Sequence, residues 1–520
     1  MGIWNIYFIT KLYFYFTHCM GFHAWLNIAF AVFLSVPISE HYARLKPVKQ
    51  IIAIPTGIVL FYYDTWLPPI SRVFSQIPQL EGFSLSYLAE LAGRFFNPLI
   101  IGGLILLILA YYFTRRKYRI SSFVFLVMLA PLFSIGQGRP PQPEAAGAIA
   151  TGSIPSPATD DAILTRQLKA FYRDEAERTV SFSPPSKSET PFDIIFLHVC
   201  SLSWDDLDFT QQRDHPLFKR FDIVFTNFNS AASYSGPAAI RLLRGSCGQP
   251  IHKALYDTAP AQCLTMDNMR QIGFDQQLAM NHDGHYGGFL DDVRKGGGLN
   301  STPFGYAGIP TYLQSFDGSP VYDDYAVLLK WWEKRVQSTN ERVVLFYNSI
   351  SLHDGNYYSG RRTNSMEIYT PRLTRFLDDM DRFFSVLQAS GKRVVVVFVA
   401  EHGASIRGDR MQIAGLREIP SPRITIVPVG IKLIGMPDNP AATPFMVTMP
   451  TSYLAVSQLL ANFVAVTPFG KSNLSMEDYV RDLPATEFVS ENEDVVVMRH
   501  SKQYFIQAKD ADWVEYDVLE

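Results

Sequence analysis

The first 136 residues are dominated by long apolar runs, whereas later residues alternate short apolar runs with polar ones. The N-terminal part contains five apolar stretches, which are Ile3–Thr17, Ala24–Ile38, Val48–Tyr63, Phe96–Phe113 and Ile120–Ile135. A helix needs about 20 residues to cross a bilayer, with roughly 17 as the usual minimum. We expect the fourth and fifth stretches to span a membrane, and the first three to do so with their aromatic and histidine flanks included.

The basic residues of this part of the chain predict its orientation. They form two groups, after the second and after the fourth stretch, and are Arg44, Lys46, Lys49, Arg115, Arg116, Lys117 and Arg119. Because such residues accumulate on the cytoplasmic side, both groups fit five spans with the N-terminus inside. The chain after the fifth span then lies outside the cytoplasm. The first stretch is not predicted to be a cleavable signal peptide, since no small-residue cleavage site separates it from the second.

The composition changes after the last apolar stretch. Residues 137–160 are rich in Pro, Ala, Gly and Ser and predict a flexible linker. Residues 161–179 repeat apolar positions at helical spacing among charged ones, which predicts an amphipathic helix that lies either on the membrane or on the next domain. We therefore expect a transmembrane domain over 1–136, a linker with a helix over 137–191, and an outer domain over 192–520.

The outer domain alternates strand and helix patterns. The predicted strands are Asp193–Val199, Asp222–Phe228, Val343–Ser349, Arg393–Ala400 and Val429–Gly435, and the clearest helices are Tyr322–Ser338 and Tyr369–Ser390. Near-continuous apolar strands that alternate with helices indicate an α/β fold, with a mainly parallel sheet covered by helices on both faces. In such sheets ligands bind beyond the carboxyl ends of the strands, so polar residues that follow strands are the candidate site residues.

The chain has four cysteines. Cys19 ends the first apolar stretch, and the other three fall on the outer side, where disulfides persist. Cys247 and Cys263 are close in sequence and stand in loop-like contexts, so we predict that they pair. Cys200 then stays free at the end of a predicted strand, where it is either a buried core cysteine or a ligand.

Polar residues also follow other predicted strands. Glu401 and His402 follow the strand Arg393–Ala400, as possible metal ligands or as part of a surface turn. His353 follows the strand Val343–Ser349 by a few residues, where a hydrogen-bonded loop histidine is the alternative. Ser235 fits the N-cap of a helix, either as a simple cap or as a nucleophile where backbone N–H groups favour an anion such as phosphate.

Several phrases around these residues are long and distinctive. They are C-S-L-S-W from Cys200, N-F-N-S-A-A-S-Y-S-G-P-A-A-I-R-L-L-R from Asn227, F-D-G-S-P-V-Y-D-D from Phe316, L-H-D-G-N from Leu352 and E-H-G-A-S-I-R-G-D-R-M-Q-I-A-G-L-R from Glu401. They resemble the membrane-bound phosphoethanolamine transferases of the alkaline phosphatase superfamily, most closely those of bacterial cellulose-synthesis systems. The resemblance extends over the spans, the linker and the outer domain.

The resemblance implies a zinc-dependent site. Its metal ligands would be Cys200, Glu401, His402 and the nucleophile Ser235, and its further active-site residues His353, Tyr234 and Arg417. Thiolate, imidazole and carboxylate groups suit tetrahedral zinc, and metal coordination activates a serine hydroxyl. The superfamily usually has an acidic residue in place of Cys200 and often a further histidine after the acid-His pair. Here the only later histidine is His500, so a full second metal site is not implied.

The implied reaction moves phosphoethanolamine from phosphatidylethanolamine to a glucose hydroxyl of cellulose, expected at carbon 6, through a phosphorylated Ser235. The implied location is the bacterial inner membrane, with the catalytic domain in the periplasm beside cellulose synthase subunits. The alternatives are transfer to lipid A or another glycan, hydrolysis by a phosphodiesterase or sulfatase, and a non-enzymatic scaffold. The net charge of −3 argues against a nucleic-acid partner.

Overall fold

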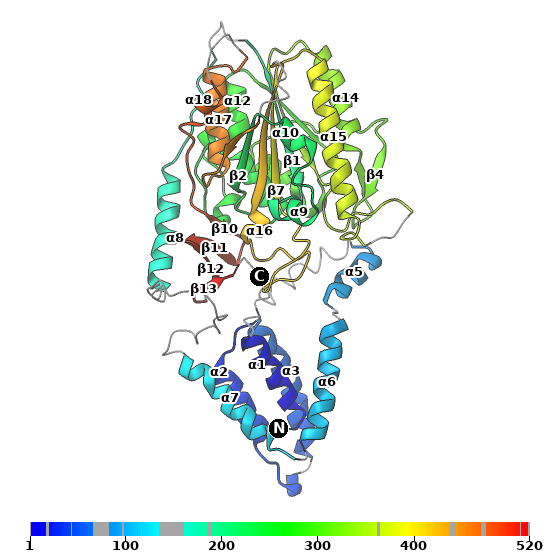
Figure 1. The fold of residues 1–520 in the computed structure, drawn as a ribbon, viewed down its shortest axis with the longest axis vertical. Coiled ribbons are helices and arrows are strands. Elements are labelled where there is room, and N and C mark those ends of the chain that lie inside the picture. Colours follow the sequence, from blue (N-terminus) through cyan, green and yellow to red (C-terminus); the bar gives the residue numbers. More distant parts are fainter. Residues whose placement is uncertain are drawn as a thin grey trace, which may run out of the picture. The chain divides into compact units, whose positions relative to one another are not determined.

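The computed structural model describes residues 2–16, 20–42, 44–65, 83–95, 98–115, 117–134, 161–185, 190–360, 364–436, 443–469, 475–509 and 511–517. The chain forms two compact units, which are drawn in Figure 1. The first contains residues 1–73 and 91–160, and the second contains residues 74–90 and 161–520. Cys19 and the predicted linker at 137–160 lie outside the described residues.

The first unit is helical. Its helices are α1 (Trp4–Phe16), α2 (Ala24–Ser35), η1 (Glu40–Tyr42), α3 (Leu45–Tyr63), α6 (Pro98–Thr114) and α7 (Ile120–Ser134), and α5 (Leu85–Phe95) runs across the boundary between the units. Among the described residues, α3 is the one helix long and apolar enough to cross a membrane. The helices α6 and α7 have 17 and 15 residues. The five-span arrangement therefore remains a prediction.

A seven-stranded sheet forms the centre of the second unit. Its strands are β1 (Asp193–Cys200), β2 (Ile223–Asn229), β3 (Asp275–Met280), β6 (Val343–Ser349), β7 (Val394–His402), β8 (Ile426–Ile434) and β9 (Phe445–Val447), in the order β3-β6-β1-β7-β8-β2-β9. Only β8 runs antiparallel to its neighbours. The sheet is thus mixed but mainly parallel, as the sequence predicts.

Helices cover both faces of this sheet, with α12, α17 and α18 on one side and α14 and α15 on the other (Figure 1). The helices of the unit are α8 (Asp161–Ala176), α9 (Trp204–Phe209), α10 (Pro216–Arg220), α11 (Ser235–Leu243), α12 (Thr265–Gln271), α13 (Phe289–Asp291), α14 (Asp324–Gln337), α15 (Tyr369–Ala389), α16 (Pro422–Thr425), α17 (Tyr453–Ala465) and α18 (Met476–Val480). Short η turns are η2 (His252–Tyr256), η3 (Ala261–Cys263), η4 (Tyr286–Gly288) and η5 (Asp292–Gly296). Every residue of β1, β6 and β7 is buried, which explains why these strands read as apolar runs.

Two smaller sheets accompany the large one. The first is a hairpin of β4 (Thr311–Gln314) and β5 (Pro320–Tyr322), and the second joins β10 (Val489–Glu491), β11 (Val495–His500), β12 (Gln503–Ala508) and β13 (Val514–Tyr516). Leu164 and Phe171 of α8 pack with Met498 of β11 and with Trp513, which directly precedes β13. The apolar face of this amphipathic helix is therefore covered by its own unit.

The cysteines of the second unit behave as their spacing predicts. Cys247 and Cys263 form a disulfide, 16 residues apart in sequence. Cys200 is free and fully buried. The side chains around Cys200 show whether it is a core residue or a candidate ligand.

Candidate metal centre

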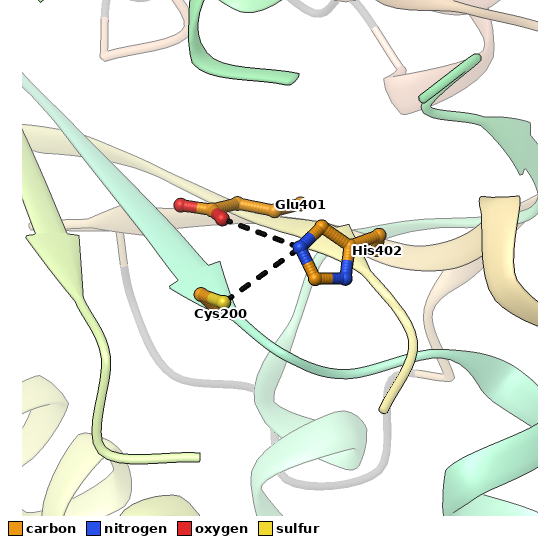
Figure 2. A group of neighbouring side chains, drawn as sticks. All are labelled: Cys200, Glu401 and His402. Carbon is orange, nitrogen blue, oxygen red and sulfur yellow. Dashed lines mark hydrogen bonds and ion pairs between the residues drawn. The ribbon is translucent and has the colours of Figure 1, made fainter. Parts of the chain in front are cut away.

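Three candidate ligands converge at the carboxyl ends of two neighbouring strands. Cys200 ends β1, and Glu401 and His402 end β7. One ligand atom from each lies within 4.8 Å of the others, and all three residues are buried. Figure 2 shows the imidazole of His402 facing both the sulfur of Cys200 and the carboxylate of Glu401. The candidate ligands that the sequence places at the ends of two strands are thus neighbours in the structure.

An irregular register explains how two consecutive residues reach the same site. Adjacent residues of a regular strand point to opposite faces. Here Val199 pairs with Ala400, but Cys200 pairs with His402, so the register shifts by one residue at Glu401. Such a bulge redirects side chains, and bulges are common beside active sites. Glu401 and His402 belong to β7 rather than to a turn after it, and the bulge brings both to the ligand group.

Ser235 completes a set of four donor groups. Its Oγ lies 3.2 Å from Cys200 Sγ and 3.4 Å from His402 Nε2. The sequence placed Ser235 at the N-cap, but Tyr234 holds that position and Ser235 is the first residue of α11. The hydroxyl of Ser235 faces the ligand group and sits at the N-terminus of a nine-residue helix, where an anion is stabilised.

The protonation of His402 suits a metal ligand. Its Nδ1 lies 3.0 Å from the carbonyl oxygen of Gly403, which only accepts, so Nδ1 carries the hydrogen. Nε2 is then left with a lone pair directed at Cys200 and Ser235. Burial, together with the positive charge of Arg417, keeps the pKa of His402 well below its ordinary value. The imidazole is therefore neutral, as a ligand must be.

Without a cation, the charged forms of Cys200 and Glu401 are destabilised by burial. Burial and the neighbouring Glu401 raise the pKa of the Cys200 thiol, and burial raises the pKa of Glu401 itself. The Oε2 atom of Glu401 is buried and meets no hydrogen-bond donor in good geometry. A divalent cation would offset these desolvation costs, and one sulfur, one imidazole and one carboxylate form a donor set typical of a catalytic zinc, which keeps a further position for a reacting group. The residues present therefore fit the metal that the sequence resemblance implies.

A buried chain of hydrogen bonds orients Glu401. The backbone N–H of Gly284 donates to His282 Nδ1 at 3.1 Å, which leaves His282 Nε2–H to donate to Asn348 Oδ1 at 2.8 Å. Asn348 Nδ2 in turn donates to Glu401 Oε1 at 2.6 Å. His198 Nδ1 lies 3.2 Å from the same oxygen, and burial lowers the pKa of His198 to about 3. One oxygen of Glu401 is thus fixed, while the other faces the ligand group.

Sequence reasoning missed these supporting residues. His198 and Asn348 sit inside the apolar strands β1 and β6, where they face each other across the parallel pair. A polar residue within an otherwise apolar buried strand needs a hydrogen-bond partner, so the two polar residues in these apolar runs are themselves the sequence signal for a buried hydrogen-bond network. Their partner becomes apparent only when β7 is placed beside β1.

We predict that Asn348→Ala weakens zinc binding by about 10- to 100-fold, because partners that orient a ligand contribute this much to metal affinity. Zinc competition with a chromophoric chelator measures the effect. Asn281→Ala is the matched control, since Asn281 is equally buried but its side chain bonds to Ser351 and to the backbone of Ile350. Equal zinc affinity in the two variants would contradict this role of Asn348.

The remaining predicted residues lie around this centre. Leu352 donates its backbone N–H to the carbonyl of Cys200 at 3.2 Å, which places His353 beside the end of β1. Arg417 Nη1 donates to Ser201 Oγ at 3.1 Å, and that hydroxyl lies 3.0 Å from Cys200 Sγ. Arg417 therefore supplies a positive charge next to the ligand group.

His353 is arranged to accept a proton. Its Nδ1 donates to the carbonyl oxygen of Asp354 at 2.6 Å, so Nε2 holds a lone pair. Burial and the neighbouring Arg417 lower the pKa of His353 to about 4.

Tyr234, the N-cap of α11, donates its hydroxyl to Glu418 Oε1 at 2.5 Å. The guanidinium of Arg417 lies 5.9 Å from the centre of the Tyr234 ring, so the structure brings the seven predicted residues into one region.

Comparison with known proteins identifies the family. The C-terminal domain model of the cellulose biosynthesis protein BcsG matches residues 150–513, and the N-terminal domain model matches residues 4–132. The chain is also 40% identical to the BcsG of Escherichia coli over 99% of its own length and 96% of that protein. This chain belongs to the BcsG family. The BcsG of Salmonella typhimurium shows the same identity and coverage.

Solved structures resemble this BcsG-family chain more distantly. An alkaline phosphatase superfamily protein from Vibrio parahaemolyticus is 13% identical with a TM-score of 0.48, and the match covers 68% of this chain and 89% of that one. The C-terminal periplasmic domain of EptC from Escherichia coli, in complex with Zn, is 13% identical with a TM-score of 0.43, covering 66% and 97%. At these scores the likeness adds nothing to the strand order described above.

Proposed function

We propose that this chain transfers phosphoethanolamine from phosphatidylethanolamine to glucose hydroxyls of cellulose. Ser235 is the nucleophile, and it carries the phosphoethanolamine group covalently between the two steps. The observation that carries the proposal is the position of Ser235 Oγ, 3.2 Å from Cys200 Sγ and 3.4 Å from His402 Nε2. A serine hydroxyl is a weak nucleophile unless its surroundings activate it. The family name of the relatives supports cellulose as the acceptor.

Zinc is the cofactor that the site fits. Cys200, Glu401 and His402 would hold it, with Ser235 as the fourth contact. When bound, it would supply Lewis-acid chemistry that lowers the pKa of a nearby hydroxyl and neutralises phosphoryl charge. Among the described residues, no other group of three such ligands comes together.

The first step transfers the headgroup to the protein. Ser235 Oγ forms a bond to the phosphorus of phosphatidylethanolamine, and the bond from phosphorus to the diacylglycerol oxygen breaks. His353 Nε2 takes the proton from Ser235 and returns it to the departing oxygen, so that neutral diacylglycerol leaves. Arg417 faces the non-bridging oxygens and compensates their charge.

The second step transfers the group to the sugar. A glucose hydroxyl, which we place at carbon 6 because it is the primary and least hindered one, attacks phosphorus, and the bond to Ser235 Oγ breaks. His353 accepts the hydroxyl proton and passes it to Ser235. Because burial and Arg417 lower the pKa of His353 to about 4, the imidazole is unprotonated at neutral pH and able to act as this base.

A membrane location follows from the proposed donor. Phosphatidylethanolamine is a lipid, so we place the chain in the bacterial inner membrane as a multi-pass protein with the catalytic unit in the periplasm. The five-span topology puts residues 64–95 on the outer side. Residues 83–90 belong to the catalytic unit, which supports that topology. Tethering raises the effective concentration of both substrates, and cellulose synthase subunits are the proposed neighbours.

We predict that the purified full-length protein, in vesicles that contain phosphatidylethanolamine, attaches phosphoethanolamine to cello-oligosaccharides. Vesicles of phosphatidylglycerol are the control and should give no product, since they lack the donor headgroup. Mass spectrometry of the sugars gives the result. Release of free phosphoethanolamine without a sugar product would indicate a hydrolase, and modification of added lipid A alone would indicate another acceptor. Unchanged polymer modification in cells that carry Ser235→Ala would indicate a scaffold.

A further inference from the structure

Residues 83–90 stand in an unexpected position. In sequence they lie between the third and fourth apolar stretches, far from the outer domain. In the structure they belong to the same compact unit as the candidate metal centre. The backbone N–H of Ser84 donates to the carbonyl of Phe316 at 3.2 Å, across more than two hundred residues of chain.

Aromatic packing connects this segment to His353. The rings of Phe83 and Tyr87 lie 5.0 and 5.7 Å from the ring of Phe316. Tyr286 packs on the same ring at 4.3 Å, and Phe316 is only 3% exposed. Phe316 in turn contacts the imidazole of His353 at 5.4 Å between centroids. The segment therefore covers the ring on which the proposed catalytic base rests.

Hydrogen bonds connect the segment to the residue after His353. Tyr87 donates its hydroxyl to Asp354 Oδ2 at 3.1 Å. Ser365 donates its backbone N–H to Glu90 Oε1 at 3.1 Å, and its hydroxyl lies 2.6 Å from Asp354 Oδ1. Both carboxylate oxygens of the buried Asp354 are thus engaged by this network.

The backbone around His353 leaves little room for movement. The carbonyl of Asp354 accepts the Nδ1 hydrogen of His353, so the position of Asp354 sets the tautomer and the direction of the ring. Gly355 has a φ of +78°, and a Cβ at this position would meet the ring of Tyr87 at 2.8 Å. The Tyr87 ring therefore lies directly on the loop. Arg372 also holds this loop, because its Nη1 donates to the carbonyl of His353 at 2.9 Å.

We propose that residues 83–90 are a positioning element of the catalytic site, which fixes the His353–Asp354 loop through Phe83, Tyr87 and Glu90. The role in catalysis rests on the proposed transferase function. Without the segment, the ring of Phe316 and the carboxylate of Asp354 lose partners, and His353 samples more orientations. A small misplacement of a catalytic group lowers the rate of the chemical steps more than it weakens substrate binding. A segment that precedes the linker in sequence therefore contributes to the site within the second unit.

The test uses the full-length protein in lipid vesicles with three variants. The double variant Phe83→Ala/Tyr87→Ala removes both rings, and Tyr87→Phe removes only the hydrogen bond to Asp354. Leu85→Ala is the matched control, because Leu85 belongs to the same segment but is 86% exposed. Hydrogen–deuterium exchange of the peptide around His353, kcat and KM for the lipid donor, and bound zinc are measured for each.

The double variant is expected to speed exchange around His353, and to lower kcat at least about tenfold with KM and zinc content unchanged. Tyr87→Phe should lower kcat by roughly 2- to 10-fold, the range for one hydrogen bond. Leu85→Ala should match the wild type throughout. Unchanged exchange in the double variant would overturn the inference even if the protein proved not to be a transferase. So would an unchanged kcat in an active protein, or a loss of zinc that parallels the loss of activity.

Discussion

Ser235→Ala is expected to reduce phosphoethanolamine transfer by about 1,000-fold or more, while the protein stays folded and keeps its zinc. Removing the nucleophile of a covalent mechanism costs this much because the alternative, direct attack of the sugar on the lipid, lacks an activated group. Zinc should be retained, since Cys200, Glu401 and His402 still provide three ligands. Transfer of labelled phosphoethanolamine to cello-oligosaccharides and zinc analysis of the same sample measure both effects.

The matched control is Ser475→Ala. Ser475 also stands at the start of a helix, where it forms a capping box with Asp478. Its loss should cost about 1 kcal/mol of stability without affecting transfer. Normal transfer by Ser235→Ala would refute a covalent role for this serine, and equal loss in both variants would show that the effect is one of folding.

Cys200→Ser is expected to abolish stable zinc binding and, with it, transfer. The substitution keeps the size of the side chain but replaces a thiolate with a hydroxyl, which is a much poorer zinc ligand at neutral pH. We expect about one zinc per wild-type chain and nearly none in the variant after dialysis against a weak chelator. Zinc analysis and the transfer assay on the same preparations test this.

The control for Cys200→Ser is the double variant Cys247→Ser/Cys263→Ser. It removes the disulfide, which closes a loop of 16 residues and should contribute about 3 kcal/mol to stability. It leaves the ligand group untouched, so zinc content should match the wild type. A Cys200→Ser protein that binds zinc and transfers phosphoethanolamine normally would leave Cys200 as a core residue only.

The sequence contains enough information to locate the ligand group but not its geometry. The apolar strands that end at Cys200 and near Glu401 were recognisable from their patterns, and β6 has the predicted bounds Val343–Ser349. Neighbouring parallel strands bring their ends together, so convergence was predictable. The bulge that turns Glu401 and His402 to the same site depends on pairing between β1 and β7, which no local pattern encodes.

Other features had no clear sequence signal. The strand β3 reads D-Q-Q-L-A-M, and its first three residues are not buried, so it lacks the apolar run of a central strand. It is defined by pairing with β6 at the edge of the sheet. The contacts of Tyr87 with Asp354 join residues 267 positions apart, a distance over which periodicity gives no information. The sequence predicts Ser235 as the N-cap of its helix, but Tyr234 holds that position and Ser235 is the first helical residue.

The most direct test of the central claim is the mass of the peptide that contains Ser235 after rapid acid quenching. The full-length protein is mixed with vesicles of phosphatidylethanolamine in the absence of a sugar acceptor and digested. We predict a phosphoethanolamine adduct on Ser235, which disappears when cello-oligosaccharide is added before the quench and never forms in Cys200→Ser. Transfer to the sugar without any adduct on Ser235, or an adduct on a different residue, would contradict the mechanism.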